Sequence, residues 1–238
     1  MYDIAIPQNN EEELVERYLK NKIKKIIFGY FIKDKKDLEI FKLENLFYFK
    51  KIKIYYLAIV ENENIEKTLK LISDLFYSEK LYNDLVFIKG SSLEINSKLL
   101  NYYYYNGLFL ENLYSKEKFY FTNLDKNCFN KLKKNNQALL FSLKDAIKDP
   151  YSFKFLFKIL QRKKIPFLYG SFASEKSEVP NKYELKAFYK IFEIRYSLEV
   201  LDIFLFKQIK RTRIAKNKLY FNKDFYILKL PFEDCCEF

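Results

Sequence analysis

The sequence predicts an α/β fold, a single-domain irregular (β/α) barrel of the TIM-barrel-like type. Short apolar runs alternate with amphipathic helical patterns along the chain, an order typical of parallel sheets. Seven such runs, nearly evenly spaced, favour a barrel over the alternative, an open doubly wound sheet. The 238 residues suit one domain with a sizeable core and fall slightly below the ~250 residues of a usual eightfold barrel.

The predicted strands are short and rich in Ile, Leu, Val and Phe. They are residues 2–6, 26–31, 52–60, 85–88, 108–113, 138–143 and 165–169. A further strand is predicted at 225–230. No convincing eighth barrel strand fits between Ile194 and Ser197, which is why the predicted barrel is irregular.

The predicted helices carry apolar side chains at spacings of three and four residues. Asp149 is the expected N-cap of one helix, and Pro150 is its expected first residue. The helices are residues 11–22, 35–49, 64–81, 127–134, 151–163, 185–192 and 197–216. Residues 91–98 are predicted to be a loop and turn, and the aromatic run 99–105 has no clear pattern.

Composition excludes several classes of protein. Hydrophobic residues make up 49 % and aromatic residues 19 %, far too apolar for a disordered chain. The absence of histidine excludes Ser-His triads, histidine acid–base pairs and histidine metal ligands. The three cysteines have no metal-ligand spacing. No apolar stretch reaches the ~18 residues of a spanning helix. Together with an amino terminus unlike a targeting segment, these features predict a cytoplasmic protein.

The chain is strongly basic. Its formal net charge is +12, from 43 basic and 31 acidic residues. Such a charge favours a polyanionic partner, usually nucleic acid. A general compositional bias toward lysine would produce the same net charge, because lysine would then fill every exposed position. In that case the charge would say less about a polyanionic partner.

Residues 165–194 hold the most specific pattern, a short apolar strand, a polar loop and an amphipathic helix. Their order resembles the last strand–loop–helix unit of archaeal RNase P protein component 3, the counterpart of the thirty-kilodalton subunit of nuclear RNase P. The matching residues are Ser171, Ala173, Glu175, Lys176, Glu178, Val179, Asn181 and Leu185.

Residues 85–143 resemble the same family more loosely. The strand 85–89 ends in Gly90, and Leu124-Asp125-Lys126 stands where the family has Ile-Asp-His. Lys126 thus replaces a histidine, and Ser97 stands where the family has an arginine. These departures indicate a divergent member.

The resemblance implies a barrel protein without a catalytic centre of its own. In this family the RNA removes the 5′ leader from precursor tRNA, and RNA-bound Mg²⁺ activates the water. The expected partners are the RNase P RNA, precursor tRNA indirectly, and a small ferredoxin-like protein subunit. No cofactor bound by the protein is expected.

Two basic clusters are the predicted RNA-binding surfaces. Arginine binds phosphate in a bidentate fashion through two parallel hydrogen bonds, a geometry that lysine cannot provide. The first cluster lies near the end of the last predicted helix and comprises Lys207, Lys210, Arg211, Arg213 and Lys216. The second lines one face of an earlier helix with Lys154, Lys158 and Arg162, followed by Lys163 and Lys164. Each cluster also fits a solvated helix surface.

Isolated positions complete the predicted set. Lys176 and Lys126 are candidate RNA contacts, with Ser171 bonding locally. The tyrosine run 102–105 suits base stacking, although packing under a loop or against a partner is favoured. The carboxylates that would form a metal site at the barrel mouth are Asp3, Glu94, Glu111 and Asp145, whose spacing is unspecific.

The favoured function is therefore an RNA-binding accessory subunit of the RNase P endonuclease complex. One alternative is a divergent barrel enzyme acting on a phosphorylated metabolite. It would need several carboxylates at one barrel mouth, and the chain has no Gly-rich phosphate loop. A second alternative is a basic domain on a membrane surface, through the helix 197–216.

Overall fold

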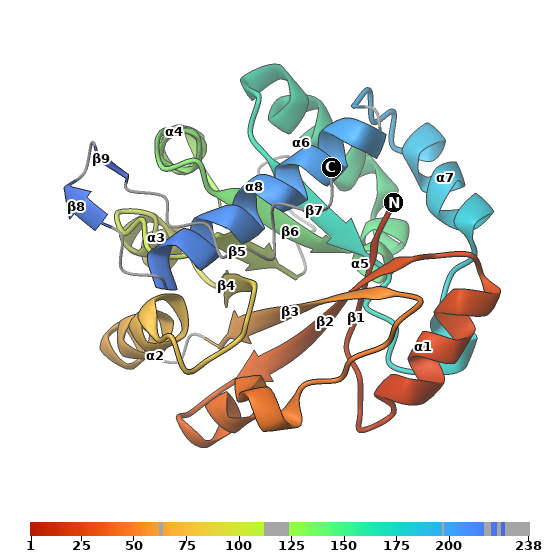
Figure 1. Cartoon of the computed structure of the whole chain (residues 1–238). Helices are drawn as coiled ribbons and strands as arrows, with labels where there is room; N and C mark the ends of the chain where they lie inside the picture. Colours follow the sequence, from red (N-terminus) through yellow and green to blue (C-terminus); the bar gives the residue numbers. More distant parts are fainter. Residues whose placement is uncertain (62–63, 112–123, 197, 217–219, 223–224, 227–238) are drawn as a thin grey trace.

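In the computed structural model, seven parallel strands form one sheet in sequence order (Figure 1). The structure describes residues 1–61, 64–111, 124–196, 198–216, 220–222 and 225–226. The strands are β1 (Asp3–Ala5), β2 (Lys25–Ile32), β3 (Lys53–Val60), β4 (Leu85–Lys89), β5 (Gly107–Leu110), β6 (Ala138–Ser142) and β7 (Phe167–Gly170).

The sheet closes on itself between β7 and β1. The Phe172 amide donates to the Ile4 carbonyl at 2.8 Å, and the Ile6 amide donates to the Ala173 carbonyl at 2.9 Å. Gly170 permits this approach, because a Cβ there would lie 2.4 Å from the Cβ of Ile4. The predicted TIM-barrel-like α/β fold is confirmed, with seven strands in the closed ring.

Helices alternate with the strands and cover the outside of the barrel. They are α1 (Glu11–Lys20), α2 (Ile65–Tyr77), α3 (Leu93–Leu99), α4 (Lys126–Lys134), α5 (Leu143–Lys148), α6 (Pro150–Lys163), α7 (Lys182–Ile191) and α8 (Leu198–Lys216). Short 3₁₀ helices are η1 (Lys36–Phe41), η2 (Leu43–Asn45) and η3 (Lys176–Glu178). An antiparallel pair, β8 (Tyr220–Asn222) and β9 (Phe225–Tyr226), follows α8.

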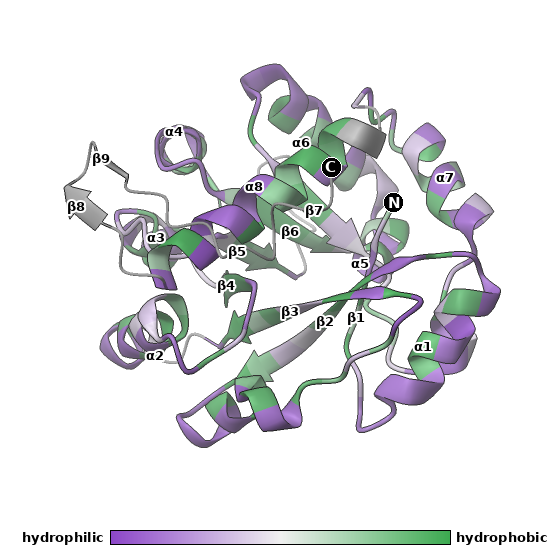
Figure 2. Ribbon diagram, viewed as in Figure 1, coloured by the Kyte–Doolittle hydropathy of each residue, from purple (hydrophilic) through white to green (hydrophobic). Residues whose placement is uncertain are grey.

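Two apolar layers bury both faces of the strands, as expected of a parallel barrel. Alternate strand residues such as Ile4, Leu57 and Phe87 fill the interior. Their neighbours, such as Phe28 and Phe141, pack beneath the helices. The strands are therefore largely apolar, with hydrophilic residues mainly at their ends, while the helices mix hydrophobic and hydrophilic residues (Figure 2).

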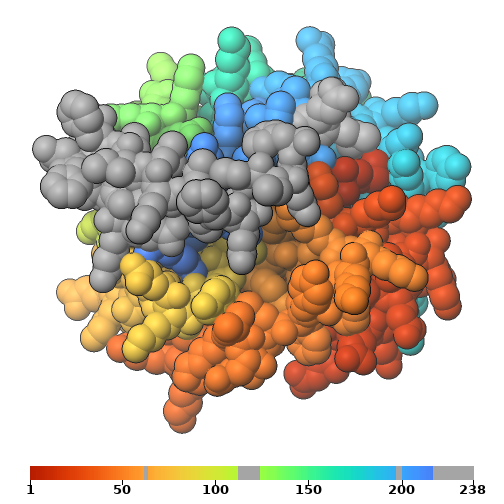
Figure 3. All heavy atoms as spheres, in the orientation of Figure 1, coloured from red at the N-terminus to blue at the C-terminus, as the bar shows by residue number. Residues whose placement is uncertain are grey.

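Two predicted elements are wrong. Residues 35–49 form η1 and η2 and an irregular segment in place of a helix, in the orange part of Figure 3. In this segment Leu43 and Tyr48 are 66 % and 85 % exposed. The predicted loop 91–98 contains α3, which begins where the Ser92 hydroxyl accepts from the Ile95 amide. Leu143, predicted as the last residue of the strand 138–143, instead begins α5.

The remaining boundaries follow local chemistry. Asp149 caps α6 by accepting from the Ser152 amide at 3.3 Å, and Pro150 is the first residue of that helix, as predicted. Helix α2 ends at Tyr77, four residues before the predicted end. The predicted strand 225–230 is present as β9, and its residues 227–230 lie outside the described residues.

Candidate nucleic-acid interface

Helix α8 lies across the N-terminal end of the barrel, the end at which the strands begin. Leu205 and Ile209 belong to the apolar cluster of the barrel interior. The helix contacts the segments that precede β4, β5 and β6, and Asp202 binds Lys25 at the start of β2 at 2.9 Å. Figure 1 shows α8, in blue, crossing in front of the strands. The predicted basic helix therefore closes one end of the barrel.

Buried polar contacts centre on Asn106, which is fully buried. Its Oδ1 accepts from the Val86 amide at 2.6 Å and from the Thr212 hydroxyl at 2.9 Å. Its Nδ2 donates to the Gln208 carbonyl at 2.9 Å. Since buried polar groups are costly when unpaired, this network fixes the rotation of α8 relative to the barrel.

Three of the five cations predicted on this helix bind the chain itself. Arg211 donates to the backbone carbonyls of Asn135, at 3.0 Å, and of Tyr103. Arg213 binds the Asp84 carboxylate at 2.9 Å. These guanidinium groups hold loops against α8, so their part in RNA contact stays a prediction.

Lys216 is buried at the end of α8. Its Nζ donates to Asn83 at 2.7 Å and to the Leu81 carbonyl. Burial lowers the pKa of Lys216 to about 7, against the attraction of Asp84. Burial also raises the pKa of Asp84, and the charge of Arg213 opposes that rise. The position of Lys216 indicates a structural role.

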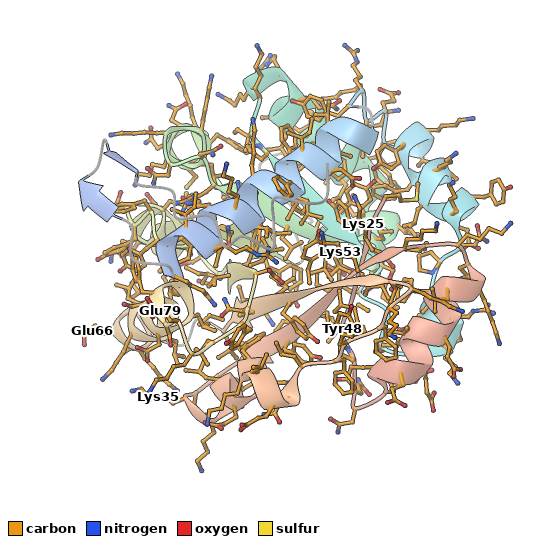
Figure 4. All side chains as sticks on the ribbon, in the orientation of Figure 1. Lys25, Lys35, Tyr48, Lys53, Glu66 and Glu79 are labelled. Carbon is orange, nitrogen blue, oxygen red and sulfur yellow. The ribbon has the colours of Figure 1, made fainter. Side chains whose placement is uncertain are left out.

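Lys207 and Lys210 lie on the outer side of the same helix. Both are exposed, and neither forms an ion pair with a described residue. At the N-terminal end of the barrel, Lys25 and Lys53 are register partners on β2 and β3 and lie next to each other below α8 (Figure 4). Sequence reasoning missed this second pair; the only signal was a lysine at the start of each strand.

The second predicted cluster lies on α6. Lys154 and Lys158 share one carboxylate, Glu193, at 2.5 and 3.3 Å. This pairing lowers the pKa of Glu193 through hydrogen bonds from both lysines. Arg162 and Lys164 are exposed, whereas Lys163 is half-buried. The α6 cluster is thus a separate surface whose charge is partly neutralised.

Lys176 and Lys126 lie toward the opposite end of the barrel from α8. Lys176 follows β7 and binds Glu13 of α1 at 3.2 Å. Lys126 is the exposed first residue of α4, the helix that follows β5. The structure therefore divides the predicted contacts between two ends of the barrel and the outer face of α6. No observation tests whether any of them touches RNA.

The motif after β7 holds the fold together. The Ser171 amide and hydroxyl donate to the buried Asp3 carboxylate at 2.7 and 2.6 Å, which ties β7 to β1. Glu178 binds Lys144 at 2.5 Å and accepts from the Ser174 amide, contacts that lower its pKa to about 2. Asn181 caps α7 in a capping box. Ser171, Glu178 and Asn181, which belong to the family resemblance, thus have structural roles. The Ser171 hydroxyl accepts locally from the Ala173 amide at 3.2 Å, but its shorter bond joins it to Asp3, far along the chain.

Asp3 makes the stability of the barrel seam depend on pH. Burial raises the pKa of Asp3 in the folded state, despite hydrogen bonds from Ser171 and Tyr18. When the pKa of a carboxyl group is higher in the folded state than in the unfolded state, the protein loses stability as pH rises from the unfolded pKa toward the folded pKa. Asn does not titrate, so the Asp3→Asn variant escapes this loss. We expect its free energy of unfolding, relative to that of wild type, to rise as pH increases from 4 to 7. Urea unfolding across that range measures the change, and a constant difference would contradict it.

The C-terminal mouth of the barrel is filled by aromatic rings. Phe109 and Phe172 stack with centroids 5.0 Å apart, and Phe31 lies 6.1 Å from Phe109. The four carboxylates considered for a metal site do not meet: Asp3 is buried at the seam, and Glu94, Glu111 and Asp145 bind separate lysines. Among the described residues, no three His, Cys, Asp or Glu side chains gather as a metal site.

The tyrosine run has mixed environments. Tyr105 is fully buried, and Tyr102, Tyr103 and Tyr104 form edge-to-face ring contacts. Within the run, only Tyr103 stays more than half exposed, at 53 %. The run therefore packs within its own loop and, through Tyr104, against Tyr77 of α2. Of the cysteines, Cys128 is buried and unpaired, and Cys235 and Cys236 lie outside the described residues.

The membrane-surface alternative needs an exposed apolar face on α8. Leu201 and Leu205 are buried against the barrel, and Phe204 is half-buried. The outward side of the helix mixes lysines with single apolar residues. No helix within the described part of the chain is both long and apolar enough to cross a membrane.

Comparison with solved structures shows where this fold occurs. A chain of the cryo-EM structure of archaeal ribonuclease P with mature tRNA superposes with a TM-score of 0.70 and 15 % identity, covering 97 % of this chain and 99 % of that one. Histidinol phosphate phosphatase from Lactococcus lactis, complexed with zinc, L-histidinol and phosphate, has a TM-score of 0.51 and 11 % identity, over 81 % and 92 % of the two chains. No family model and no curated protein matches the sequence. The predicted resemblance is confirmed as a shared fold.

Proposed function

We propose that this chain is a protein subunit of ribonuclease P that binds and stabilises the catalytic RNA for removal of the 5′ leader from precursor tRNA. The similarity to a chain of archaeal ribonuclease P carries the proposal, because the two chains match almost from end to end. The order of residues from Ser171 to Leu185 supports it independently. A small ferredoxin-like subunit is the proposed protein partner, and the cytoplasm the proposed location.

The proposed contribution is electrostatic. Lysines neutralise RNA phosphates and release counterions, so RNA affinity falls steeply with salt. The phosphodiester chemistry belongs to Mg²⁺ held by the RNA. A protein with this role needs a basic surface and a rigid scaffold. The exposed pair Lys207 and Lys210, on a helix anchored by Asn106, meets both requirements.

The phosphatase-like structure does not support a second function. Its similarity to this chain, at 11 % identity, shows only a shared fold. The zinc belongs to the phosphatase and implies no zinc site in this chain. The present chain has no histidine. Phe109 and Phe172 stack at the barrel mouth, the face at which a barrel enzyme binds its substrate.

Charge reversal at Lys207 and Lys210 tests the proposal. We expect the K207E/K210E variant to lose stimulation of precursor-tRNA cleavage by the cognate RNA and the other protein subunits at moderate Mg²⁺. The slope of log affinity for the RNA against log salt should shrink by about 1.5, because about two phosphate contacts disappear.

The matched control is K186E/K190E, which makes the same charge change on exposed lysines of α7. It should retain both stimulation and salt slope, and unfolding curves should show both variants folded. A wild-type chain that neither stimulates cleavage nor binds the RNA in a salt-sensitive way would overturn the proposed function.

A further inference from the structure

Exposed apolar and basic side chains alternate on the outer side of α8. Leu205 and Ile209 mark the side of α8 that faces the barrel. With 3.6 residues per turn, the opposite side carries, in order around the helix, Phe206, Lys210 and Lys207. Phe206 is 56 % exposed. The ring therefore stands in solvent next to lysines that have no carboxylate partner among the described residues.

A second exposed ring lies beyond these lysines. Arg211 follows Lys207 by one turn, and its guanidinium donates to the Tyr103 carbonyl in the loop before β5. This bond holds the loop against α8, and Tyr103 is 53 % exposed there. Arg211 is thus a positioning residue. We call Phe206, Lys207, Lys210 and Tyr103 the α8 platform.

The chemistry of this platform differs from that of the α6 cluster. An exposed ring near a free ammonium group can stack on a base while the lysine contacts the adjoining phosphate. On α6, the exposed ring of Phe155 lies near Lys154 and Lys158, which already share Glu193. The α8 platform, by contrast, combines two exposed rings with lysines that lack an ion pair within the described residues.

We propose that the α8 platform binds unpaired RNA, with bases stacked on Phe206 and Tyr103 and phosphates at Lys207 and Lys210. The inference rests on the proposed function and specifies the kind of RNA element that this surface takes. A duplex hides its base faces within its own stack, so it engages only the lysines. Stacking accepts every base, so the platform holds a single-stranded segment with little regard to sequence.

Leucine substitutions separate stacking from simple apolar contact. Leucine keeps apolar bulk at a site but removes the aromatic face. We expect F206L/Y103L to weaken binding of a short mixed-sequence single-stranded RNA by about tenfold and to leave affinity for a blunt RNA duplex unchanged. Fluorescence anisotropy with the full chain at fixed salt measures both.

Y151L is the matched control, since Tyr151 is 86 % exposed on α6, outside the platform. It should bind both RNAs as wild type does. Equal melting temperatures should show all variants folded, since each ring is more than half exposed.

The outcomes distinguish this inference from the proposed function. If K207E/K210E weakens RNA binding but F206L/Y103L does not, the stacking inference is overturned and the proposed function stands. An equal loss for single strand and duplex in F206L/Y103L would also overturn stacking. If F206L/Y103L binds RNA normally while F206A/Y103A fails to assemble with the other protein subunits, the rings belong to a protein interface. A wild-type chain that binds neither RNA overturns both proposals.

Discussion

Gly107→Ala should destabilise the barrel by about 3 kcal/mol or more. Gly107 begins β5 between β4 and β6, pairing with Phe87 on one side and Ala138 on the other. A Cβ there would lie 1.7 Å from the Ala138 carbonyl oxygen, and the residue has a φ of 154° that alanine rarely adopts. The neighbouring strand would have to move, because the colliding atoms are backbone. Urea unfolding measures the loss, and a drop of about 8 °C in melting temperature should accompany it.

Gly90→Ala is the control for this prediction. A Cβ at Gly90 would also be crowded, at 2.6 Å, but by the flexible end of the Leu110 side chain. A side chain can rotate away, so this variant should lose much less stability. Equal losses for the two glycines would show that crowding of the β5–β6 backbone is not the cause.

Arg213→Met should cost about 2 to 3 kcal/mol by leaving the buried Asp84 carboxylate without its cation. Asp84 is 7 % exposed and accepts hydrogen bonds from the Tyr56 amide and from Arg213. The Arg213 guanidinium is half exposed, so water already screens part of its charge. The expected loss of stability is therefore smaller than that for breaking a fully buried ion pair. The double variant D84N/R213M should recover most of the loss, because the Asn side chain needs no counter-charge. Chemical unfolding of the two single variants and the double variant measures the coupling.

The sign of the pH dependence provides a second test of this ion pair. Arg213 holds down the pKa of Asp84, which burial raises. Without Arg213 that pKa rises further, and the carboxyl group becomes neutral at a higher pH. The deficit of Arg213→Met should therefore shrink as pH falls from 8 toward 5. A deficit that grows on acidification would contradict the assignment.

Local patterns predicted most of the secondary structure because they depend on neighbouring residues. The cap at Asp149 and the proline at 150 fixed the start of α6 within the sequence itself. The apolar runs marked all seven barrel strands for the same reason. Residues 35–49 were predicted wrongly because their apolar spacing suits a helix, whereas in the fold Tyr56 binds the backbone of Phe47 and holds this segment irregular.

Site residues were harder to predict, because a basic residue in the sequence can either face solvent or be buried within the fold. Lys207 and Lys216 belong to one basic run, yet Lys207 faces solvent and Lys216 is buried against Asn83. No spacing in the sequence distinguishes Arg213, whose partner Asp84 lies 129 residues away. Lys25 and Lys53 meet only because β2 and β3 pair in register.

The sequence by itself determined the α/β barrel, the strand order that follows from alternation, and the resemblance carried by residues 171–185. These rest on local periodicity and on residue order, which the chain holds before it folds. Only the tertiary structure decided that α8 closes the N-terminal end of the barrel and that Arg211, Arg213 and Lys216 are bound within the fold. It also left Lys207 and Lys210 in solvent. The physical reason is that burial and charge pairing arise from contacts between distant segments.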